Sequence, residues 1–178
     1  MRLFVGTFLE QEQKINIGKM RDALKPHLVA GRAVHADNLH FTWLFLGETA
    51  ANEIGGINDA LKQAAALSAQ FDTSFCGVEN FSGGTVVASL KNSKSFSEVY
   101  GNIFDGTGSY ASAPPAKFRP HVTMLRDAHF SMPFSEAKKS VMIFNRPFTV
   151  AGFSLIESRV INGRLTYAPL SEFYLKPE

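Results

Sequence analysis

The stretch that decides the fold is Asn38-Leu39-His40-Phe41-Thr42-Trp43-Leu44-Phe45-Leu46-Gly47, and its pattern recurs in Arg119-Pro120-His121-Val122-Thr123-Met124-Leu125-Arg126. Each run contains a histidine, one apolar residue and a threonine, followed by further apolar side chains. Short runs rich in aromatic and β-branched residues predict β-strands. Gly47 closes the first strand, and Pro120 stands at the entrance of the second, where a proline is tolerated.

Side chains of a strand point to alternate faces, so residues i and i+2 share a face. We therefore expect His40 and Thr42 on one face of the first strand, and His121 and Thr123 on one face of the second. The opposite face of the first strand should pack in the core through Leu39, Phe41, Trp43 and Phe45. Each strand thus presents an imidazole beside a hydroxyl.

This pair of side chains suits chemistry at phosphorus. The unperturbed pKa of histidine, about 6.5, lets it give and take a proton near neutrality. A threonine hydroxyl can donate to an anionic oxygen. Two such units facing each other supply an acid, a base and two hydroxyl donors, which is what in-line displacement at phosphorus needs without a metal. One unit alone is a weak signal, but two in a small chain indicate a shared site.

Composition limits the alternatives. The 178 residues fit one domain, and 45% are hydrophobic, including 16 phenylalanines, which predicts an aromatic core. The formal net charge of +2 argues against a strongly electrostatic nucleic-acid binder, but not against binding of a short RNA end. The single cysteine, Cys76, allows no intramolecular disulfide. No signal-peptide pattern or membrane-length apolar run is present, so we expect a cytoplasmic protein.

Periodicity predicts alternating helices and strands, and hence an α+β fold. Helices are expected over residues 11–28, from 48–52 to 67, and over 93–105, with N-caps at Thr49 or Asn52 and at Ser93 or Ser95. Residues 31–37 are expected to form a polar approach to the first motif. Further strands are expected over residues 2–9, 71–81, 85–90, 148–158 and 164–175, the last two joined by a tight turn at Asn162-Gly163.

The two motifs resemble those of the two-histidine phosphoesterase superfamily, and within it the bacterial RNA 2′,3′-cyclic phosphodiesterases, also called 2′-5′ RNA ligases. The resemblance spans nearly the whole chain. It includes Arg2-Leu3-Phe4-Val5-Gly6, both motif runs, and Leu155, Ser158, Gly163 and Tyr167. It implies one bilobal domain over residues 1–178, in which two pseudo-symmetric lobes, each an antiparallel sheet with helices on its outer face, surround a central active-site cleft.

The resemblance also implies an activity. This is metal-independent hydrolysis of RNA 2′,3′-cyclic phosphate ends to 2′-phosphates, with reversible ATP-independent 2′-5′ ligation at the same site. It implies His40 as the acid and His121 as the base, although the residues alone leave these roles interchangeable. Thr42, Thr123 and Arg126 would hold phosphate oxygens. The expected partners are RNA ends or small nucleotides bearing a cyclic phosphate. We expect a monomer without cofactor, membrane or obligate protein partner.

Arg126 is the third candidate after the two histidines, and the residues just before the second motif are weaker ones. Arg126 follows His121 by five positions, so strict alternation places it on the opposite face. It can reach the cleft only if the strand ends, bulges or twists before it. Lys117 and Arg119 could meet flanking phosphates, or could be solvated surface. Phe118 could stack on a nucleobase, or could belong to the aromatic core.

Two further functions are compatible with the sequence. The chain could be a superfamily phosphodiesterase acting on 2′-5′ oligoadenylate or ADP-ribose cyclic phosphate, or a non-catalytic module that binds RNA ends. A zinc site on His40 and His121 is disfavoured, because neither motif places a carboxylate on the same face. Cys76 is disfavoured as a nucleophile, because nothing in its surroundings marks it as activated.

Overall fold

The computed structural model describes residues 1–112 and 117–177. The helices are α1 (Gln11–Leu24), α2 (Ile54–Leu67), α3 (Lys94–Thr107) and α4 (Phe134–Ala137). The strands are β1 (Arg2–Phe8), β2 (Leu28–Ala33), β3 (His40–Glu48), β4 (Phe71–Thr73), β5 (Phe75–Phe81), β6 (Thr85–Leu90), β7 (His121–Phe130), β8 (Phe148–Val150), β9 (Gly152–Ile161) and β10 (Arg164–Tyr174).

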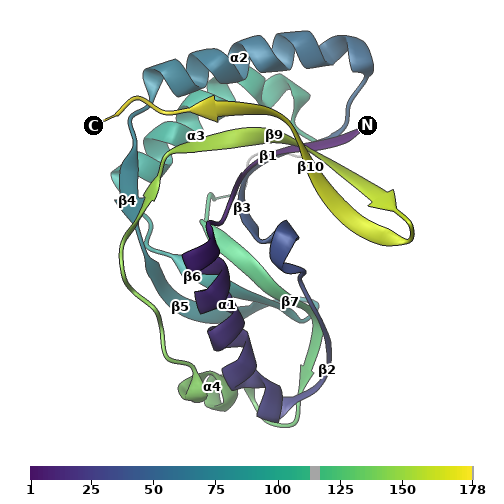
Figure 1. Ribbon diagram of the computed structural model, residues 1–178, viewed down its shortest axis with the longest axis vertical. Coiled ribbons are helices and arrows are strands. Elements are labelled where there is room, and N and C mark those ends of the chain that lie inside the picture. The colour runs from purple at the N-terminus through teal and green to yellow at the C-terminus, as the bar shows by residue number, and fades with distance from the viewer. Residues whose placement is uncertain (113–116, 178) are drawn as a thin grey trace.

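One eight-stranded antiparallel sheet runs through the molecule, with the strand order β10-β9-β1-β3-β7-β6-β5 and with β2 paired to β7 (Figure 1). Its first half contains β10, β9, β1 and β3, and its second half contains β2, β7, β6 and β5, while β4 and β8 form a separate ribbon. The motif strands β3 and β7 join the two halves through one residue pair, Phe41 with Val122. Helices α2 and α3 lie at one end of the molecule, and α1 and α4 lie at the other. This is the α+β fold that the periodicity predicted, in the two-lobed arrangement that the family resemblance implied.

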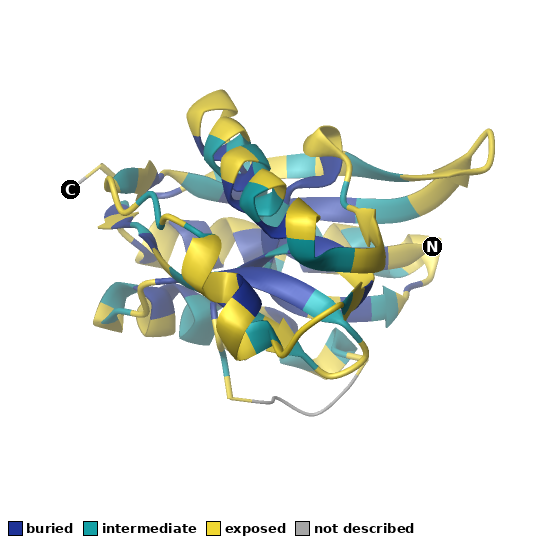
Figure 2. Cartoon of the chain, turned by 90° about the horizontal axis from the view of Figure 1, so that it is seen from below, coloured by how far each residue is buried: buried dark blue, intermediate teal, exposed yellow. Residues whose placement is uncertain are grey.

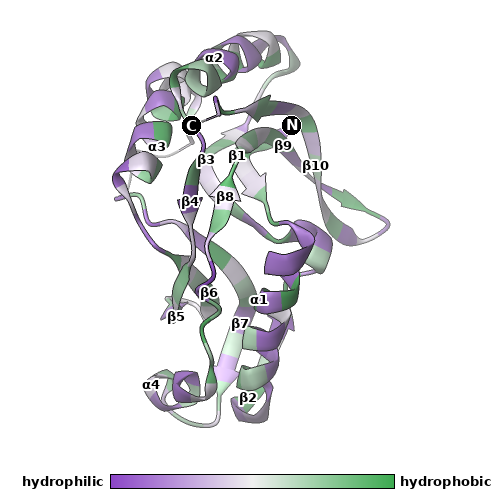
Figure 3. Cartoon of the chain, turned by 60° about the vertical axis from the view of Figure 1, so that its left-hand side comes forward, coloured by the Kyte–Doolittle hydropathy of each residue, from purple (hydrophilic) through white to green (hydrophobic). Residues whose placement is uncertain are grey.

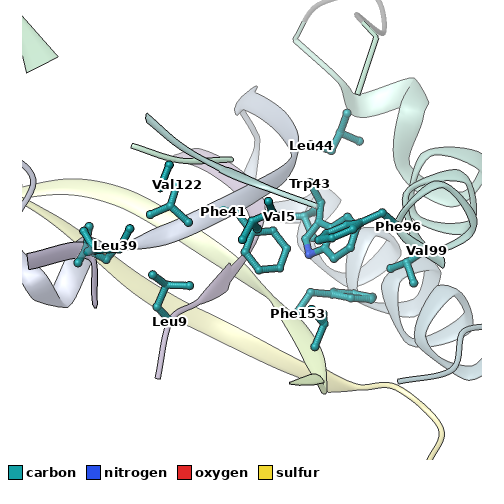
Figure 4. Close-up of a cluster of buried hydrophobic side chains, with 14 of the residues drawn as sticks. Val5, Leu9, Leu39, Phe41, Trp43, Leu44, Phe96, Val99, Val122 and Phe153 are labelled. Carbon is teal, nitrogen blue, oxygen red and sulfur yellow. The ribbon is translucent and has the colours of Figure 1, made fainter. Parts of the chain in front are cut away.

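The core of the first lobe is aromatic, as the phenylalanine content predicted. Phe41 and Trp43 of β3 are buried, and their rings lie 5.7 and 5.4 Å from the ring of Phe96 on α3. Figure 4 shows these rings together with Phe153 of β9 and Val122 of β7. Each such side chain contributes roughly 1.5–3 kcal/mol through burial, so this cluster fixes α3 onto the motif strand.

Helix α1 covers the opposite lobe from the strand that precedes it. It follows β1 in the first half of the sheet but contacts β7 in the second half. Its buried residues Ile17, Met20 and Leu24 recur at three- and four-residue spacing, which gives one apolar stripe. Figure 2 shows burial along the described part of the chain, with buried residues concentrated on the strands and exposed residues on the outer faces of the helices.

Some boundaries differ from the sequence predictions. The first helix ends at Leu24 rather than residue 28, because Pro26 lies in a 3-10 turn at Lys25–His27 and cannot donate a helical hydrogen bond. Strand β2 begins at Leu28, the last residue of the predicted helix, and extends into the predicted polar approach as far as Ala33. Its residues are mostly exposed and so show no apolar alternation. The predicted strand 71–81 is two strands, interrupted at Ser74.

The helix N-termini were predicted with mixed success. Ser93 caps α3, since its hydroxyl accepts a hydrogen bond from the Phe96 N–H. The expected caps Thr49 and Asn52 of the second helix are wrong. The Ala50 N–H instead donates to Glu53 Oε2 at 2.8 Å, before α2 begins at Ile54. The carboxylate of Glu53 therefore accepts a backbone hydrogen bond near this helix N-terminus, in place of a cap by Thr49 or Asn52.

The hairpin of β9 and β10 projects beyond the body of the protein (Figure 3). Its turn residues Asn162 and Gly163 have φ angles of 50° and 75°, as the predicted tight turn requires. Ser158, Leu165 and Tyr167 of this hairpin contribute side chains to the site described below. Among the residues with described positions, no helix is long and apolar enough to cross a membrane.

Candidate active site

The contact between the motif strands sets the geometry of the site. Phe41 and Val122, the only residue pair that joins β3 to β7 in the described chain, are the middle residues of the two His-x-Thr motifs. Both are buried, with exposed fractions of 1% and 0%. Because neighbouring side chains alternate across a sheet, the histidine and threonine on either side of each point to the opposite face. The two motifs are thereby placed next to each other on one face.

One pocket of about 410 Å³, the motif pocket, is lined by His40 and Thr42 of β3 and by His121 and Thr123 of β7. In the antiparallel register around the central pair, the histidine of each strand neighbours the threonine of the other. The pocket therefore holds two imidazoles and two hydroxyls related by an approximate two-fold axis. Such a set can bind one anion from both sides and exchange protons with it.

Both histidine rings are oriented by the backbone. His40 Nδ1 lies 2.7 Å from the carbonyl oxygen of Asn38, and His121 Nδ1 lies 2.6 Å from that of Arg119. A carbonyl only accepts, so each Nδ1 carries a proton and donates it, and each Nε2 is left available for proton transfer. His40 Nε2 also lies 3.1 Å from Thr42 Oγ1. The same device, a carbonyl two residues earlier, fixes both rings.

His40 lies in an aromatic surrounding. Its ring centroid is 4.9 Å from that of Phe4 and 5.0 Å from that of Tyr167. Burial is the main cause that lowers the pKa of His40 to about 4, and the positive charges of Arg126 and His121 act in the same direction. The hydrogen bond from Nδ1 to the backbone opposes this only in part. In the substrate-free protein His40 is therefore neutral near pH 7.

Arg126 lines the motif pocket because strand β7 bulges. The pairing of β6 with β7 slips by one residue at Met124, and Met124 and Leu125 are both buried in place of alternating. A bulge reverses the alternation beyond it. Arg126 consequently shares the face of His121 and Thr123, although five positions separate it from the histidine.

Strand β3 bulges in the same way at Trp43. Trp43 and Leu44 are both buried, with exposed fractions of 3% and 7%. Phe45 comes next, is 62% exposed and lines the motif pocket. The expectation that Phe45 packs in the core is therefore wrong, because it assumed unbroken alternation after Thr42.

Three candidates beside the second motif do not line the motif pocket. Phe118 stacks on Trp43, with ring centroids 5.6 Å apart and planes 5° apart, and so belongs to the aromatic core. Arg119 donates to Glu79 Oε2 at 2.6 Å, and Lys117 is exposed. Of these, Arg119 contributes to the site through its carbonyl oxygen, a role that no sequence pattern indicated.

Residues from the first lobe complete the pocket. Arg2 of β1, Ser158 of β9 and Tyr167 of β10 also line it. Asn38 braces this wall, since its Nδ2 donates to the Leu165 carbonyl at 2.9 Å and its Oδ1 accepts from the Tyr167 N–H at 3.3 Å. In the sequence, these residues were marked only by the family resemblance, because no local pattern links β10 to β3.

The described residues offer neither a metal-binding cluster nor an activated thiol. Within residues 1–112 and 117–177, no group of three or more His, Cys, Asp or Glu side chains is placed to hold a metal ion. Burial and the charge of Glu79 raise the pKa of the Cys76 thiol, which lowers its thiolate fraction. The polar groups of the motif pocket are thus imidazole, hydroxyl and guanidinium.

Known proteins share this architecture. The family model described as the 2′-5′ RNA ligase superfamily matches residues 10–160. The RNA 2′,3′-cyclic phosphodiesterase of Geobacillus stearothermophilus is 25% identical over 153 residues, covering 83% of this chain but 49% of that protein, about half its length. That of Escherichia coli K12 is 28% identical over 158 residues, covering 82% and 81%. The crystal structure of TT0787 of Thermus thermophilus has the same fold, with a TM-score of 0.84, 23% identity and full coverage of both chains.

Proposed function

This chain belongs to the 2′-5′ RNA ligase superfamily, a superfamily of enzymes, and we propose that it hydrolyses 2′,3′-cyclic phosphate ends of RNA to 2′-phosphates. The observation that carries the proposal is the motif pocket, in which His40 and His121 meet with their threonines and Arg126. The names of the two curated relatives support the choice of substrate.

In the proposed reaction the cyclic phosphate lies between the two imidazoles. The hydroxyls of Thr42 and Thr123 donate hydrogen bonds to its non-bridging oxygens. One histidine, neutral at Nε2, takes a proton from water as the water oxygen attacks phosphorus. The other histidine, protonated, gives its proton to the 3′-oxygen as the bond from phosphorus to that oxygen breaks. Water is thereby added across this bond, and a 2′-phosphate remains.

Arg126 is proposed to stabilise the charge that develops on the phosphate oxygens. A guanidinium forms charge-assisted, often bidentate hydrogen bonds with phosphate oxygens. Within a partly enclosed pocket such bonds are stronger than in water, and they act where charge increases in the transition state. Arg2 lines the same pocket from β1 and adds a second positive charge.

The low pKa of His40 bears on the roles of the two histidines. The family resemblance implies that His40 is the acid and His121 the base. An acid must hold a proton, yet burial keeps His40 neutral near pH 7 in the substrate-free protein. A bound phosphate anion beside the ring favours its protonated form. We therefore assign the acid role to His40 in the substrate complex, where the anion raises its pKa.

The same site accounts for ligation if an alcohol takes the place of water. A 5′-hydroxyl that attacks the cyclic phosphate, with loss of the 3′-oxygen, forms a 2′-5′ bond. The bond to the 3′-oxygen that breaks and the new bond to the 5′-oxygen are similar, so no nucleotide triphosphate is consumed. The attacking strand's 5′-hydroxyl then needs the same base that activates water.

The proposal is tested by turnover in the presence of EDTA. Nucleoside 2′,3′-cyclic phosphates, a 2′-5′-linked dinucleotide and ADP-ribose cyclic phosphate serve as competing substrates, and phosphorus NMR identifies the products. We expect the nucleoside cyclic phosphates to be hydrolysed fastest, to 2′-phosphates, at a rate that EDTA does not change. Formation of 3′-phosphates, loss of activity in EDTA, or preference for either other substrate contradicts the proposal.

A further inference from the structure

A second pocket of about 190 Å³ opens beside the motif pocket. The two pockets share a wall formed by His40, Thr123, Arg126, Leu165 and Tyr167. A ligand with its reacting phosphate between the histidines can therefore extend across this wall without leaving the protein surface. The second pocket thus lies where the next part of a longer substrate would go.

This second pocket is strongly basic, although the chain as a whole is nearly neutral. It is lined by Arg32 of β2, Arg126 of β7 and Arg164 of β10, with His35 close by in the same lining. Its lining among the described residues includes no carboxylate. We call it the arginine pocket. Because β2 and β7 belong to one lobe and β10 to the other, the cluster exists only in the folded chain.

Two of these guanidiniums are held by carboxylates at the rim. Arg32 Nη2 lies 2.5 Å from Asp127 Oδ2, and Arg164 Nη2 lies 3.6 Å from Asp37 Oδ2. All four side chains are more than half exposed, and exposed ion pairs contribute only about 0–1 kcal/mol. A phosphate can therefore replace either carboxylate at small cost, and guanidinium fits phosphate in a bidentate manner.

We propose that the arginine pocket binds a second phosphate of the substrate, the phosphodiester that joins the reacting nucleotide to its 5′ neighbour. This inference rests on the proposed function, because the cyclic phosphate must occupy the motif pocket. An RNA strand carries a second phosphate next to the cyclic phosphate at its end. A nucleoside 2′,3′-cyclic phosphate carries the cyclic phosphate alone. The protein accordingly selects RNA strands over mononucleotides through a local cluster of charge rather than through its overall charge.

The test compares kcat/KM for a nucleoside 2′,3′-cyclic phosphate with that for a trinucleotide ending in the same cyclic phosphate. We expect the wild-type protein to prefer the trinucleotide by about tenfold or more. In the double variant Arg32→Gln/Arg164→Gln this ratio should fall to within about twofold of one. The salt dependence for the trinucleotide should also flatten, by a slope of about 0.7 for each phosphate that the variant no longer neutralises.

Arg146→Gln is the matched control. Arg146 is also an exposed arginine in an ion pair, with Glu12 at 3.3 Å, and it lines neither pocket. It should keep the wild-type ratio and salt slope. Thermal melting checks that the variants fold. The single variant Arg164→Gln, with an intermediate ratio expected, provides an independent measurement.

The outcomes separate this inference from the proposed function. Hydrolysis of the mononucleotide with no gain from the trinucleotide, or a gain that survives the double substitution, overturns the arginine pocket but leaves the proposed function standing. Absence of turnover with every cyclic phosphate overturns the proposed function and the inference with it.

ADP-ribose cyclic phosphate is the third substrate in this comparison, because its additional phosphates form a pyrophosphate. An arginine-dependent gain with this compound but not with the trinucleotide overturns the assignment to RNA.

Discussion

Phe45 and Arg126 occupy equivalent positions in the two halves of the motif pocket. Each lies five residues after its motif histidine, directly beyond a bulge that buries two consecutive side chains. Both line the same pocket. The approximate symmetry of the two strands therefore places an aromatic ring opposite a guanidinium. One lobe offers a surface on which a base can stack, and the other offers a charge that a phosphate can meet.

Replacing Arg126 with glutamine should lower kcat for a nucleoside 2′,3′-cyclic phosphate roughly 10²–10³-fold, as for loss of one oxyanion donor. A mononucleotide has no second phosphate for the arginine pocket to bind, so its kcat reports on the motif pocket alone. Arg126→Lys should retain part of the activity, since it keeps the charge but not the bidentate geometry. Steady-state kinetics provide the measurement, with Arg146→Gln as the control. A kcat within about twofold of wild type in Arg126→Gln would show that this guanidinium does not act on the phosphate.

Replacing Phe45 with alanine should raise KM rather than lower kcat. Stacking of a base on an aromatic side chain contributes about 1–3 kcal/mol, which corresponds to an increase in KM of about fivefold or more. Phe45 is largely exposed, so the fold should tolerate the change. Leu67→Ala, at an exposed apolar residue of α2 away from the pocket, is the control. An unchanged KM, or a fall in kcat alone, contradicts a stacking role.

The two bulges mark the limit of what the sequence could predict about the site. Alternation correctly placed Phe41 in the core and the motif histidine and threonine on one face. It could not give the direction of Phe45 or Arg126, because nothing in the two runs specifies where a strand gains an extra residue. A bulge before Arg126 was foreseen only as a condition for reaching the cleft, and the matching bulge in the first strand was not foreseen.

Contacts between residues far apart in the sequence were the other feature of the fold that the sequence could not predict. The motif strands, the helix cap at Ser93 and the turn at Asn162-Gly163 all have local signals, and they were predicted. Strand β2 has no such signal, because five of its six residues are exposed. The brace from Asn38 to β10 joins residues 127 and 129 positions apart, and its existence depends on the order of strands in the sheet.

Alanine at either motif histidine should reduce turnover by at least 10²–10⁴-fold, the usual contribution of a general acid or base. His129→Ala is the matched control, because His129 is an exposed histidine on the same strand as His121. Circular dichroism should show that all three variants fold. Activity close to wild type in a folded His40→Ala or His121→Ala variant would remove that histidine from the mechanism.

A sulfur substrate can separate the two roles. In an analogue with sulfur in place of the 3′-oxygen, the leaving group departs without needing a proton. We expect this analogue to restore turnover in His40→Ala, which lacks the acid, and to leave His121→Ala slow. Restored turnover in His121→Ala but not in His40→Ala would make His121 the acid and His40 the base.

The dependence of kcat/KM on pH should be bell-shaped. In the free protein, activity should rise as pH increases through about 4, where His40 loses its proton, and fall again at higher pH, where no proton is left on the pair of histidines. Either assignment of roles requires one proton on the pair, so the shape is the same for both. Because a bound phosphate anion favours the protonated imidazole, the acid limb of kcat should lie at higher pH than that of kcat/KM. Coincident acid limbs would contradict the proposed effect of the substrate anion on His40.

His40 should also make the stability of the fold depend on pH. Its pKa is about 4 in the folded protein, below the value of about 6.5 expected for the unfolded chain. Between these values the unfolded chain binds a proton that the folded protein does not, so the contribution is complete above about pH 6.5 and is lost as pH falls toward 4. The difference corresponds to roughly 3 kcal/mol in the free energy of unfolding.

Urea unfolding from pH 7 to 4 should therefore show a smaller decline in the free energy of unfolding in His40→Gln than in the wild-type protein, while His129→Gln follows the wild type. Equal declines in all three proteins would mean that the His40 ring takes up its proton without cost in the folded state, and that the aromatic surrounding formed by Phe4 and Tyr167 does not hold it neutral.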